Sequence, residues 1–228
     1  MPRGRPRASA NRRLPQSLLV AAEVGLAAKS HLDLTTRDIA AIAGTHSNMI
    51  DYYFKGKAGL LTAVIDGIAR DLDARLHRLA GEIAGEPNPT ERIIRELVEA
   101  YYPHASAASV LFIEAWRADS PIKTAFETRH AASLFLRISR LIRILIKLGV
   151  YRADLDPLEA TWSVLSLVAG PLLLKPLWLG SGSIVNPDQE RWIANFTAIL
   201  TPAFTASGAA SAASPAVTDS SRNRPRAA

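Results

Sequence analysis

The sequence predicts an all-α protein in which a small N-terminal helical unit precedes a larger helical unit. Three observations lead to this fold class. Apolar residues recur at helical spacing through most of the 228 residues, and no segment alternates convincingly between apolar and polar residues as a strand would. Two short helical patterns meet at Gly44, which is typical of a helix-turn-helix. The hydrophobic content of 48% is sufficient for a sizeable core.

The N-terminal unit is predicted over residues 14–58 and contains three helices. The first is predicted over 14–29, where apolar residues follow the helical period. The second follows Thr35, because Thr35 and Asp38 have the spacing of a capping box. The third lies in the stretch THSNMIDYYF. The two short helices and the glycine between them account for the predicted helix-turn-helix.

The larger unit is predicted over residues 59–204. It begins with one long helix from Gly59 to Ile83, which the loop GEPNPTE ends because prolines and asparagine favour a turn. Another helix follows this loop, and four more are predicted over 106–118, 121–148, 157–174 and 188–204. The tail over 205–228 is rich in Ala, Ser and Pro and cannot bury enough apolar area, so we expect it to be disordered.

Positive charge is concentrated at the N-terminus. The net charge is +6, yet five arginines precede the first acidic residue, namely Arg3, Arg5, Arg7, Arg12 and Arg13. Without the charges at the two ends, the body of the chain is about neutral. Such asymmetry favours a polyanionic partner, either nucleic acid or an anionic membrane surface. We expect the basic arm over 1–13 to be disordered when unbound.

Several classes of protein are excluded or disfavoured. The chain has no cysteine, so it has no disulfide, thiolate metal site or cysteine nucleophile. No apolar run has the length of a signal peptide or of the ~20-residue span of a membrane helix, and we expect a cytoplasmic protein. The histidines lack metal-site spacing, and no GxSxG elbow, Walker loop or dinucleotide fingerprint is present. We therefore expect no enzyme activity, metal or cofactor.

Residues 12–61 resemble the N-terminal DNA-binding domain of the tetracycline-repressor (TetR) family. The resemblance is carried by an arginine before the first helix and by Ala21, Ala22, Thr35, Ile39, Ala40, Ala43, Gly44, Phe54, Lys57 and Leu60. The segment MIDYYFKGKAGLL is most similar to the branch with choline-responsive repressors. The resemblance implies a homodimeric repressor that binds a palindromic operator and is released by a small molecule. The sequence departs from the family pattern at His46, at Asp51 and after the first helix, where Lys29, Ser30 and His31 replace the usual glycine.

The third helix offers the residues that a DNA-reading helix needs. Its small and polar side chains suit a major groove about 12 Å wide, in which base edges carry a distinct pattern. The candidates for base contacts are Thr45, His46, Ser47, Asn48 and Met49. Asn48 has the geometry to pair with adenine, although Asn48 and Ser47 also suit a helix cap. The candidates for phosphate contacts are Thr36, Arg37, Tyr52, Tyr53 and Lys57, whereas the carboxylate of Asp51 would repel phosphate.

The hexapeptide PRGRPR has the composition of an AT-hook core. Its proline and glycine keep the chain extended, so Arg3, Arg5 and Arg7 can enter the narrow minor groove of A·T-rich DNA. Beside a helix-turn-helix, such an arm would strengthen binding and its salt dependence. The alternatives are a solvated tail and an architectural AT-hook protein that binds DNA without operator specificity.

The rest of the chain supplies candidates for an effector site and a dimer interface. By resemblance, the effector site falls in a region with many large amphipathic side chains, and its candidates are Tyr101, Tyr102, Phe112, Glu114, Trp116, Phe126, His130 and Trp162. Aromatic rings together with Glu114 would suit a quaternary ammonium ion, although such residues also serve as ordinary core. Two apolar segments exceed the needs of one monomer, and in the resembled family the last two helices join the protomers. The interface candidates are Leu165, Val168, Leu172, Ile193, Phe196 and Leu200.

Overall fold

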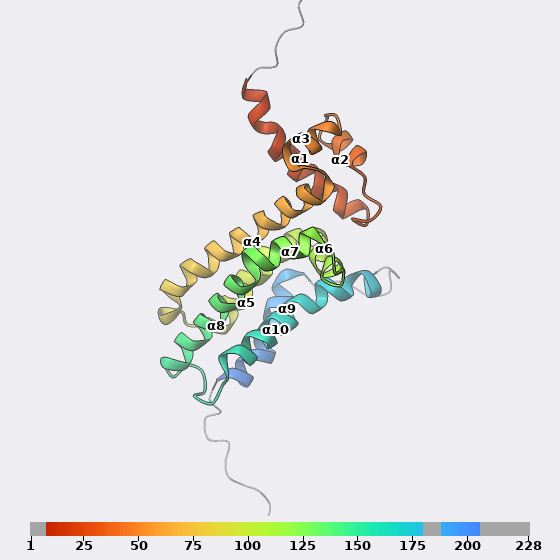
Figure 1. The fold of residues 1–228 in the computed structure, drawn as a ribbon. Helices are drawn as coiled ribbons and strands as arrows, with labels where there is room; N and C mark the ends of the chain where they lie inside the picture. The colour runs from red at the N-terminus through yellow and green to blue at the C-terminus, as the bar shows by residue number, and fades with distance from the viewer. Residues whose placement is uncertain (1–7, 180–187, 206–228) are drawn as a thin grey trace, which may run out of the picture.

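The computed structural model describes residues 8–179 and 188–205, with the backbone alone for residues 8–12 and 172–179. Every regular element in this part of the chain is helical (Figure 1), which confirms the predicted all-α class. Among the helices described, none is both long and apolar enough to cross a membrane. The predicted arm residues Arg3, Arg5 and Arg7 and the predicted tail beyond Thr205 lie outside the described residues.

The N-terminal unit contains α1 (Ala8–Ala28), α2 (Thr36–Ile42) and α3 (Asn48–Phe54). The predicted capping box is present at the start of α2. The hydroxyl of Thr35 accepts a hydrogen bond from the amide of Asp38 at 3.1 Å, and the carboxylate of Asp38 accepts one from the amide of Thr35 at 2.9 Å. Helix α1 begins before the predicted residue 14, so part of the predicted basic arm belongs to a helix.

The larger unit begins with α4 (Lys57–Glu82), which confirms the predicted long helix. The remaining helices are η1 (Ile83–Gly85), α5 (Pro89–Tyr101), η2 (Tyr102–His104), α6 (Ala105–Ala115), α7 (Pro121–Phe126), the π-helical η3 (Glu127–Ala131), α8 (Ala132–Lys147), α9 (Pro157–Leu179) and α10 (Gln189–Phe204). The single helix predicted over 121–148 is thus interrupted by a π-helical turn, a feature that often marks functional positions. Asn88 precedes α5, as predicted, but its side chain makes no capping hydrogen bond.

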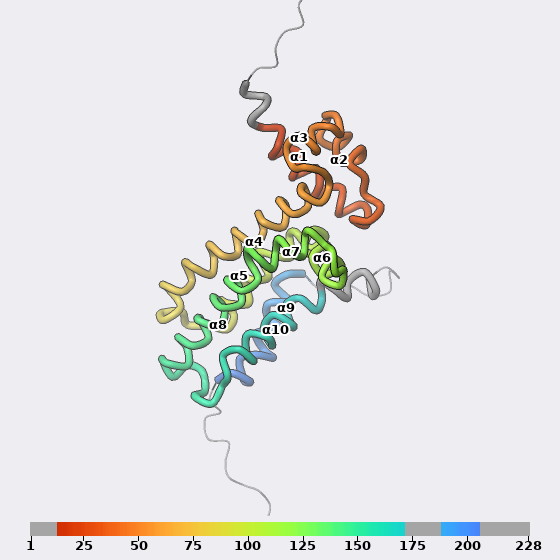
Figure 2. Tube along the Cα trace, viewed as in Figure 1, coloured from red at the N-terminus to blue at the C-terminus, as the bar shows by residue number. Residues whose placement is uncertain are grey.

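Helix α4 connects the two units. Figure 1 shows α1, α2 and α3 at one end of the molecule and α4 running from them along the larger unit. The tube in Figure 2 follows the same path and shows α5, α8, α9 and α10 side by side below the N-terminal unit. One continuous helix therefore extends from the helix-turn-helix along one side of the larger unit.

The buried side chains form two hydrophobic clusters. The first joins α1, α2 and α3 to the N-terminal half of α4, and it includes Ala107 and Val110 of α6 and Ile122 of α7. The second joins the rest of α4 to α5, α8, α9 and α10. Tyr101 and Phe126 pack against both clusters. The core of the N-terminal unit is consequently continuous with helices of the larger unit.

Candidate functional site

The helix-turn-helix presents one side of α3 to solvent. The turn between α2 and α3 contains Gly44 at φ +65°, a left-handed conformation that glycine adopts without strain, and the amide of Thr45 donates to the carbonyl of Ala40 at 2.9 Å. On the inner side of α3, Ile50 is fully buried in the first cluster. Because Ile50 fixes the rotation of α3, the residues on the opposite side face outward.

The outward side of α3 is polar. Asn48, Asp51 and Tyr52 are exposed at helical spacing i, i+3 and i+4, and Tyr52 is 68% exposed. Lys55 is also exposed directly after α3, at φ +61°. It was absent from the predicted set, although a lysine at the end of a DNA-reading helix suits a phosphate contact. Asp51 shares the face of Asn48, so its carboxylate adds a repulsive group beside any DNA backbone.

The other predicted base-contact residues differ in their exposure to solvent. His46 is exposed, and Thr45, Ser47 and Met49 are partly exposed. Met49 packs against the first cluster, so much of its side chain supports α3 from within. Ser47 is the N-cap residue of α3 but makes no capping hydrogen bond there, which leaves its hydroxyl for another partner.

Lys57 is engaged inside the protein. Its ammonium donates hydrogen bonds to the carbonyl oxygens of His31 and Leu34, both at 2.7 Å. The side chain therefore ties the loop between α1 and α2 to the start of α4, and in this conformation it does not offer its charge to a phosphate. Among the other phosphate candidates, Arg37 is exposed, while Tyr53 is partly buried against the first cluster.

The end of α3 and the start of α4 are in close contact. A Cβ atom on Gly59 would lie 1.8 Å from the carbonyl oxygen of Phe54, which is far inside van der Waals contact. Gly59 is therefore required for this approach. Since α4 packs so closely on the end of α3, a displacement of α4 also moves α3.

A buried polar pair joins the N-terminal unit to α6. The Nε2 atom of His31 and the Oε1 atom of Glu114 are 2.9 Å apart, and both side chains are almost completely buried. Burial by itself would raise the pKa of Glu114, but hydrogen bonds from Ser120 and His31 and the charge of Arg117 outweigh it and lower that pKa. Glu114 is consequently a carboxylate that links two parts of the fold.

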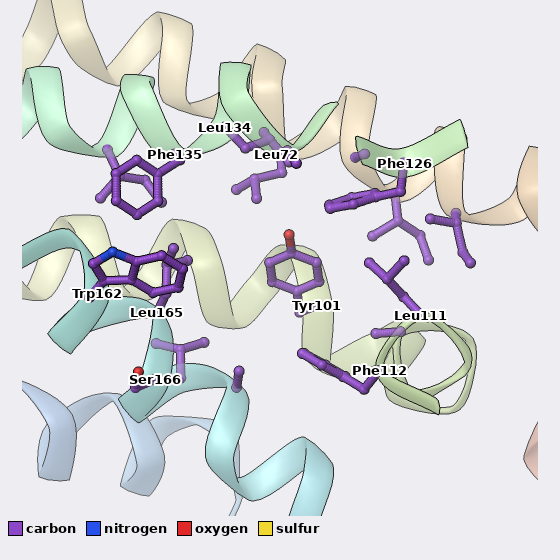
Figure 3. A pocket seen from close by; sticks show the side chains of 18 residues that line it. Leu72, Tyr101, Leu111, Phe112, Phe126, Leu134, Phe135, Trp162, Leu165 and Ser166 are labelled. Carbon is purple, nitrogen blue, oxygen red and sulfur yellow. The ribbon is translucent and has the colours of Figure 1, made fainter. Parts of the chain in front are cut away.

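A cavity of about 520 Å³ lies between α4, α5, α6, α7, α8 and α9 (Figure 3). It is partly open to solvent at its edge, where Trp162 is 63% exposed. The lining residues are mostly aliphatic and aromatic: Ile65, Ile68, Ala69, Leu72, Tyr101, Ala108, Leu111, Phe112, Phe126, Ala131, Leu134, Phe135, Ile138, Trp162, Leu165, Ser166, Val168 and Ala169. Its volume falls in the ~300–1,000 Å³ range of small-molecule sites. Tyr101 and Phe126, which contact both hydrophobic clusters, are part of its wall.

The predicted effector residues divide into two groups. Tyr101, Phe112, Phe126 and Trp162 line the cavity. The other four are not part of its wall, and each has another environment. The hydroxyl of Tyr102 contacts the carbonyl of Val168, Glu114 pairs with His31, Trp116 is 92% exposed, and Nε2 of His130 lies 2.8 Å from a carboxylate oxygen of Asp66.

The aliphatic lining residues were missed because their sequence pattern is that of ordinary helical core. Only the arrangement of six helices distinguishes Leu72 or Ile138 at the cavity from the other leucines and isoleucines of the same helices. One feature of the sequence did point to the cavity: the aromatic residues Tyr101, Phe112 and Phe126 follow one another within a short part of the chain.

Most predicted interface residues belong to the core of the single chain. Val168, Ile193, Phe196 and Leu200 are at most 5% exposed and lie in the second cluster, and Leu165 is partly buried against it. In this conformation the four buried side chains are not accessible to a partner. Their apolar character is explained by contacts within the chain. The side chain of Leu172 lies outside the described residues.

The exposed side of α10 is a different surface from the one predicted. Asn195, Ala198, Ile199 and Pro202 follow one another at helical spacing and are all exposed. Ile199 is 49% exposed. Helix α10 packs against α5 and α9 on its other side, so this stripe remains open to another molecule.

The fold is similar to solved structures of transcriptional regulators. A regulator from Saccharomonospora viridis in complex with choline has 19% identity and a TM-score of 0.65, covering 86% of this chain and 99% of its own. A TetR-family regulator from Mesorhizobium loti has 14% identity and a TM-score of 0.63, covering 86% and 98%.

The repressor SmeT of Stenotrophomonas maltophilia, in complex with triclosan, has 18% identity and a TM-score of 0.63, covering 86% of this chain and 93% of its own. No protein-family model and no curated protein matches the sequence. The similarity therefore lies in the fold, and it extends over most of the chain in each case.

Proposed function

We propose that this chain, which has the fold of TetR-family regulators, is a DNA-binding transcriptional regulator whose DNA affinity changes when a small molecule fills the cavity. The observation that carries the proposal is the position of α4. Its N-terminal residues Leu60, Leu61 and Val64 pack under the helix-turn-helix, while Ile65 and Leu72 belong to the wall of the cavity. One rigid helix thus connects a surface suited to DNA with a site suited to a ligand.

The DNA contact is assigned to the outward side of α3. Asn48 and His46 are the exposed candidates for base edges, and Tyr52, Lys55 and Arg37 are the candidates for phosphates. A helix of this length reads few base pairs, so useful specificity requires two copies on a palindrome with half-sites about 34–36 Å apart. The function therefore includes a homodimer.

We place the dimer contact on the exposed stripe of α10 and the adjoining surface of α9. Ala198, Ile199 and Pro202 offer an apolar surface on which a second α10 can pack. Ile199→Glu should convert the dimer to a monomer in light scattering. Val24→Glu is the matched control, because Val24 is similarly exposed at 52% but lies on α1. Equal effects of the two substitutions would contradict this placement.

Ligand binding would act by shifting the equilibrium between two arrangements of the dimer. A molecule in the cavity contacts α4 on one side and Tyr101 and Phe126 on the other, and these two residues support both clusters. A ligand that prefers one arrangement by about 1–3 kcal/mol changes DNA affinity about 5- to 150-fold. Release from the operator, and hence repression, is the direction we propose.

Selection of genomic DNA fragments by the purified protein tests this function against an architectural role. The wild type and a variant with Arg3, Arg5 and Arg7 replaced by Ala are incubated with sheared DNA, and the bound fragments are sequenced. The proposal expects both proteins to enrich one palindromic motif, more weakly for the variant. Enrichment of A·T-rich DNA without a palindrome, lost in the variant, would instead establish an AT-hook protein.

A further inference from the structure

We propose that the cavity is built for an uncharged, mainly apolar small molecule with one hydrogen-bonding group, and that the hydroxyl of Tyr101 is the partner of that group. The inference rests on the proposed function only in taking this molecule to be the effector. It concerns the chemistry of the ligand, which the fold alone does not determine. Three features of the cavity support it: its lack of charge, the unused hydroxyl of Tyr101 and the placement of its aromatic rings.

The described wall of the cavity contains no charged side chain. Of the 18 lining residues, only Tyr101 and Ser166 have a hydroxyl, and Trp162 adds an indole N–H. A ligand with a full charge would lose much of its hydration on entry and find no opposite charge on the described wall, which weakens its binding. The wall therefore selects against carboxylates and ammonium ions and favours neutral molecules.

Two acidic residues close in sequence to lining residues are already engaged. Glu114, the predicted partner for a cation, is held by His31 at 2.9 Å and by Arg117 at 3.2 Å. Asp66, which follows the lining residue Ile65, is paired with Arg129 and with His130. Neither carboxylate lines the cavity, so neither balances a positive ligand.

The hydroxyl of Tyr101 is directed into this space. Figure 3 shows its oxygen pointing into the cavity between Leu72 and Phe126. The hydroxyl forms no hydrogen bond with any residue that the structure describes. Burial raises the pKa of Tyr101 to about 12, so the group stays neutral near pH 7 and keeps its proton for donation. A ligand oxygen in the cavity would give this hydroxyl a hydrogen-bond partner.

The aromatic rings do not form a cage around one point. Phe135 and Trp162 face each other at one end of the cavity with ring centroids 5.0 Å apart, whereas Phe112 and Phe126 lie toward the other end (Figure 3). Cation–π recognition needs rings within about 6 Å of the same charge. The ring of Tyr101 lies between these two groups (Figure 3), so the rings are spread along the cavity and match an extended apolar body better than a quaternary ammonium.

A matched series of biphenyls tests the chemistry by isothermal titration calorimetry with the full-length protein. The series consists of 4-hydroxybiphenyl, 4-methylbiphenyl, biphenyl-4-carboxylate and biphenyl-4-yl-trimethylammonium. We expect both neutral compounds to bind and the two ions to bind at least about a hundredfold more weakly. Binding of the ammonium compound as tight as that of 4-hydroxybiphenyl, or no binding of either neutral compound, would overturn the inference.

Tyr101→Phe isolates the hydrogen bond, because it keeps the ring that packs against both clusters. It should weaken 4-hydroxybiphenyl about two- to tenfold and leave 4-methylbiphenyl unchanged. Equal weakening of both compounds, or of neither, would show that the hydroxyl of Tyr101 is not the partner. The comparison of two ligands removes any general effect of the substitution on the fold.

A second pair of variants locates the site. Ala131→Phe places a ring into the cavity, whereas Ala132→Phe changes the next residue, which is exposed and does not line it. Only Ala131→Phe should abolish binding of the neutral compounds, and equal binding by both variants would place the ligand elsewhere. DNA binding is measured on the same samples. If 4-hydroxybiphenyl binds without altering DNA affinity, the ligand class stands and the proposed effector function fails.

Discussion

The pair of His31 and Glu114 should make a large contribution to stability. Their side chains are 4% and 6% exposed, and the two atoms lie 2.9 Å apart. A hydrogen bond to a charged group is worth about 1.5–3 kcal/mol, and removal of one partner of a buried pair costs about 3–5 kcal/mol. Arg117 is 60% exposed, so its ion pair with Glu114 adds little. We expect Glu114→Ala to lower the free energy of unfolding by about 3 kcal/mol, measured by urea denaturation at pH 7.

The pH dependence of this contribution has a defined sign. The pKa of Glu114 in the folded state lies below its ordinary value of 4.5. Stabilisation from the carboxylate is therefore fully present above pH 4.5 and is lost as the pH falls through the folded-state pKa. The stabilisation by the Glu114 carboxylate should therefore persist down to about pH 5, and the difference between wild type and Glu114→Ala should shrink in more acidic solution.

Two controls identify the interaction. Trp116→Ala alters a neighbouring residue that is 92% exposed and should change stability by less than about 0.5 kcal/mol. A double-mutant cycle with His31→Ala should give a coupling energy of about 1.5–3 kcal/mol. A loss below 1 kcal/mol for Glu114→Ala, or coupling near zero, would refute the inference that this pair holds the N-terminal unit to α6.

Three further substitutions test local features. Gly59→Ala should cost at least about 1–3 kcal/mol in thermal denaturation, because its Cβ would overlap the carbonyl oxygen of Phe54, and an unchanged melting temperature would contradict that contact. Thr35→Ala should cost about 0.5–2 kcal/mol through loss of the α2 cap, whereas Thr62→Ala, on α4, lacks that effect. Lys57→Met should lower stability in urea through loss of two hydrogen bonds. A Lys57→Met variant with weaker DNA binding and unchanged stability would restore Lys57 as a phosphate contact.

The helix-turn-helix was predictable because its signals are local. The capping box of Thr35 and Asp38 lies within four residues, and Gly44 marks a turn that requires a positive φ. The periodic apolar positions of α4 likewise extend over many turns of one helix. Such features depend on short-range geometry, so the sequence alone specifies them.

The partners of individual side chains were less predictable from the sequence, because they come from distant segments of the chain. Lys57 resembles a surface cation in the sequence, yet carbonyl groups more than 20 residues away bind it. Glu114 resembles a ligand-binding carboxylate, yet its partner His31 comes from the loop after α1.

Prediction from the sequence was limited in the same way for the apolar residues of α9 and α10. Phe196 and Val168 have the apolar character of an interface, but they fill the core of one chain. Helical periodicity identifies which residues are buried, whereas it does not distinguish burial within a chain from burial between two chains. The exposed stripe with Ile199 became visible only once the packing of α10 was known.

The central claim is that α3 reads a DNA sequence, and the affinity of Asn48→Ala for matched and mismatched operators tests it most directly. Fluorescence anisotropy is recorded for wild type and variant on the selected palindrome and on duplexes with single-base changes. The account predicts that one base change weakens the wild type by about 1–3 kcal/mol and that Asn48→Ala no longer discriminates at that position. Equal losses by Asn48→Ala on every duplex, with discrimination intact, would contradict base reading by this helix.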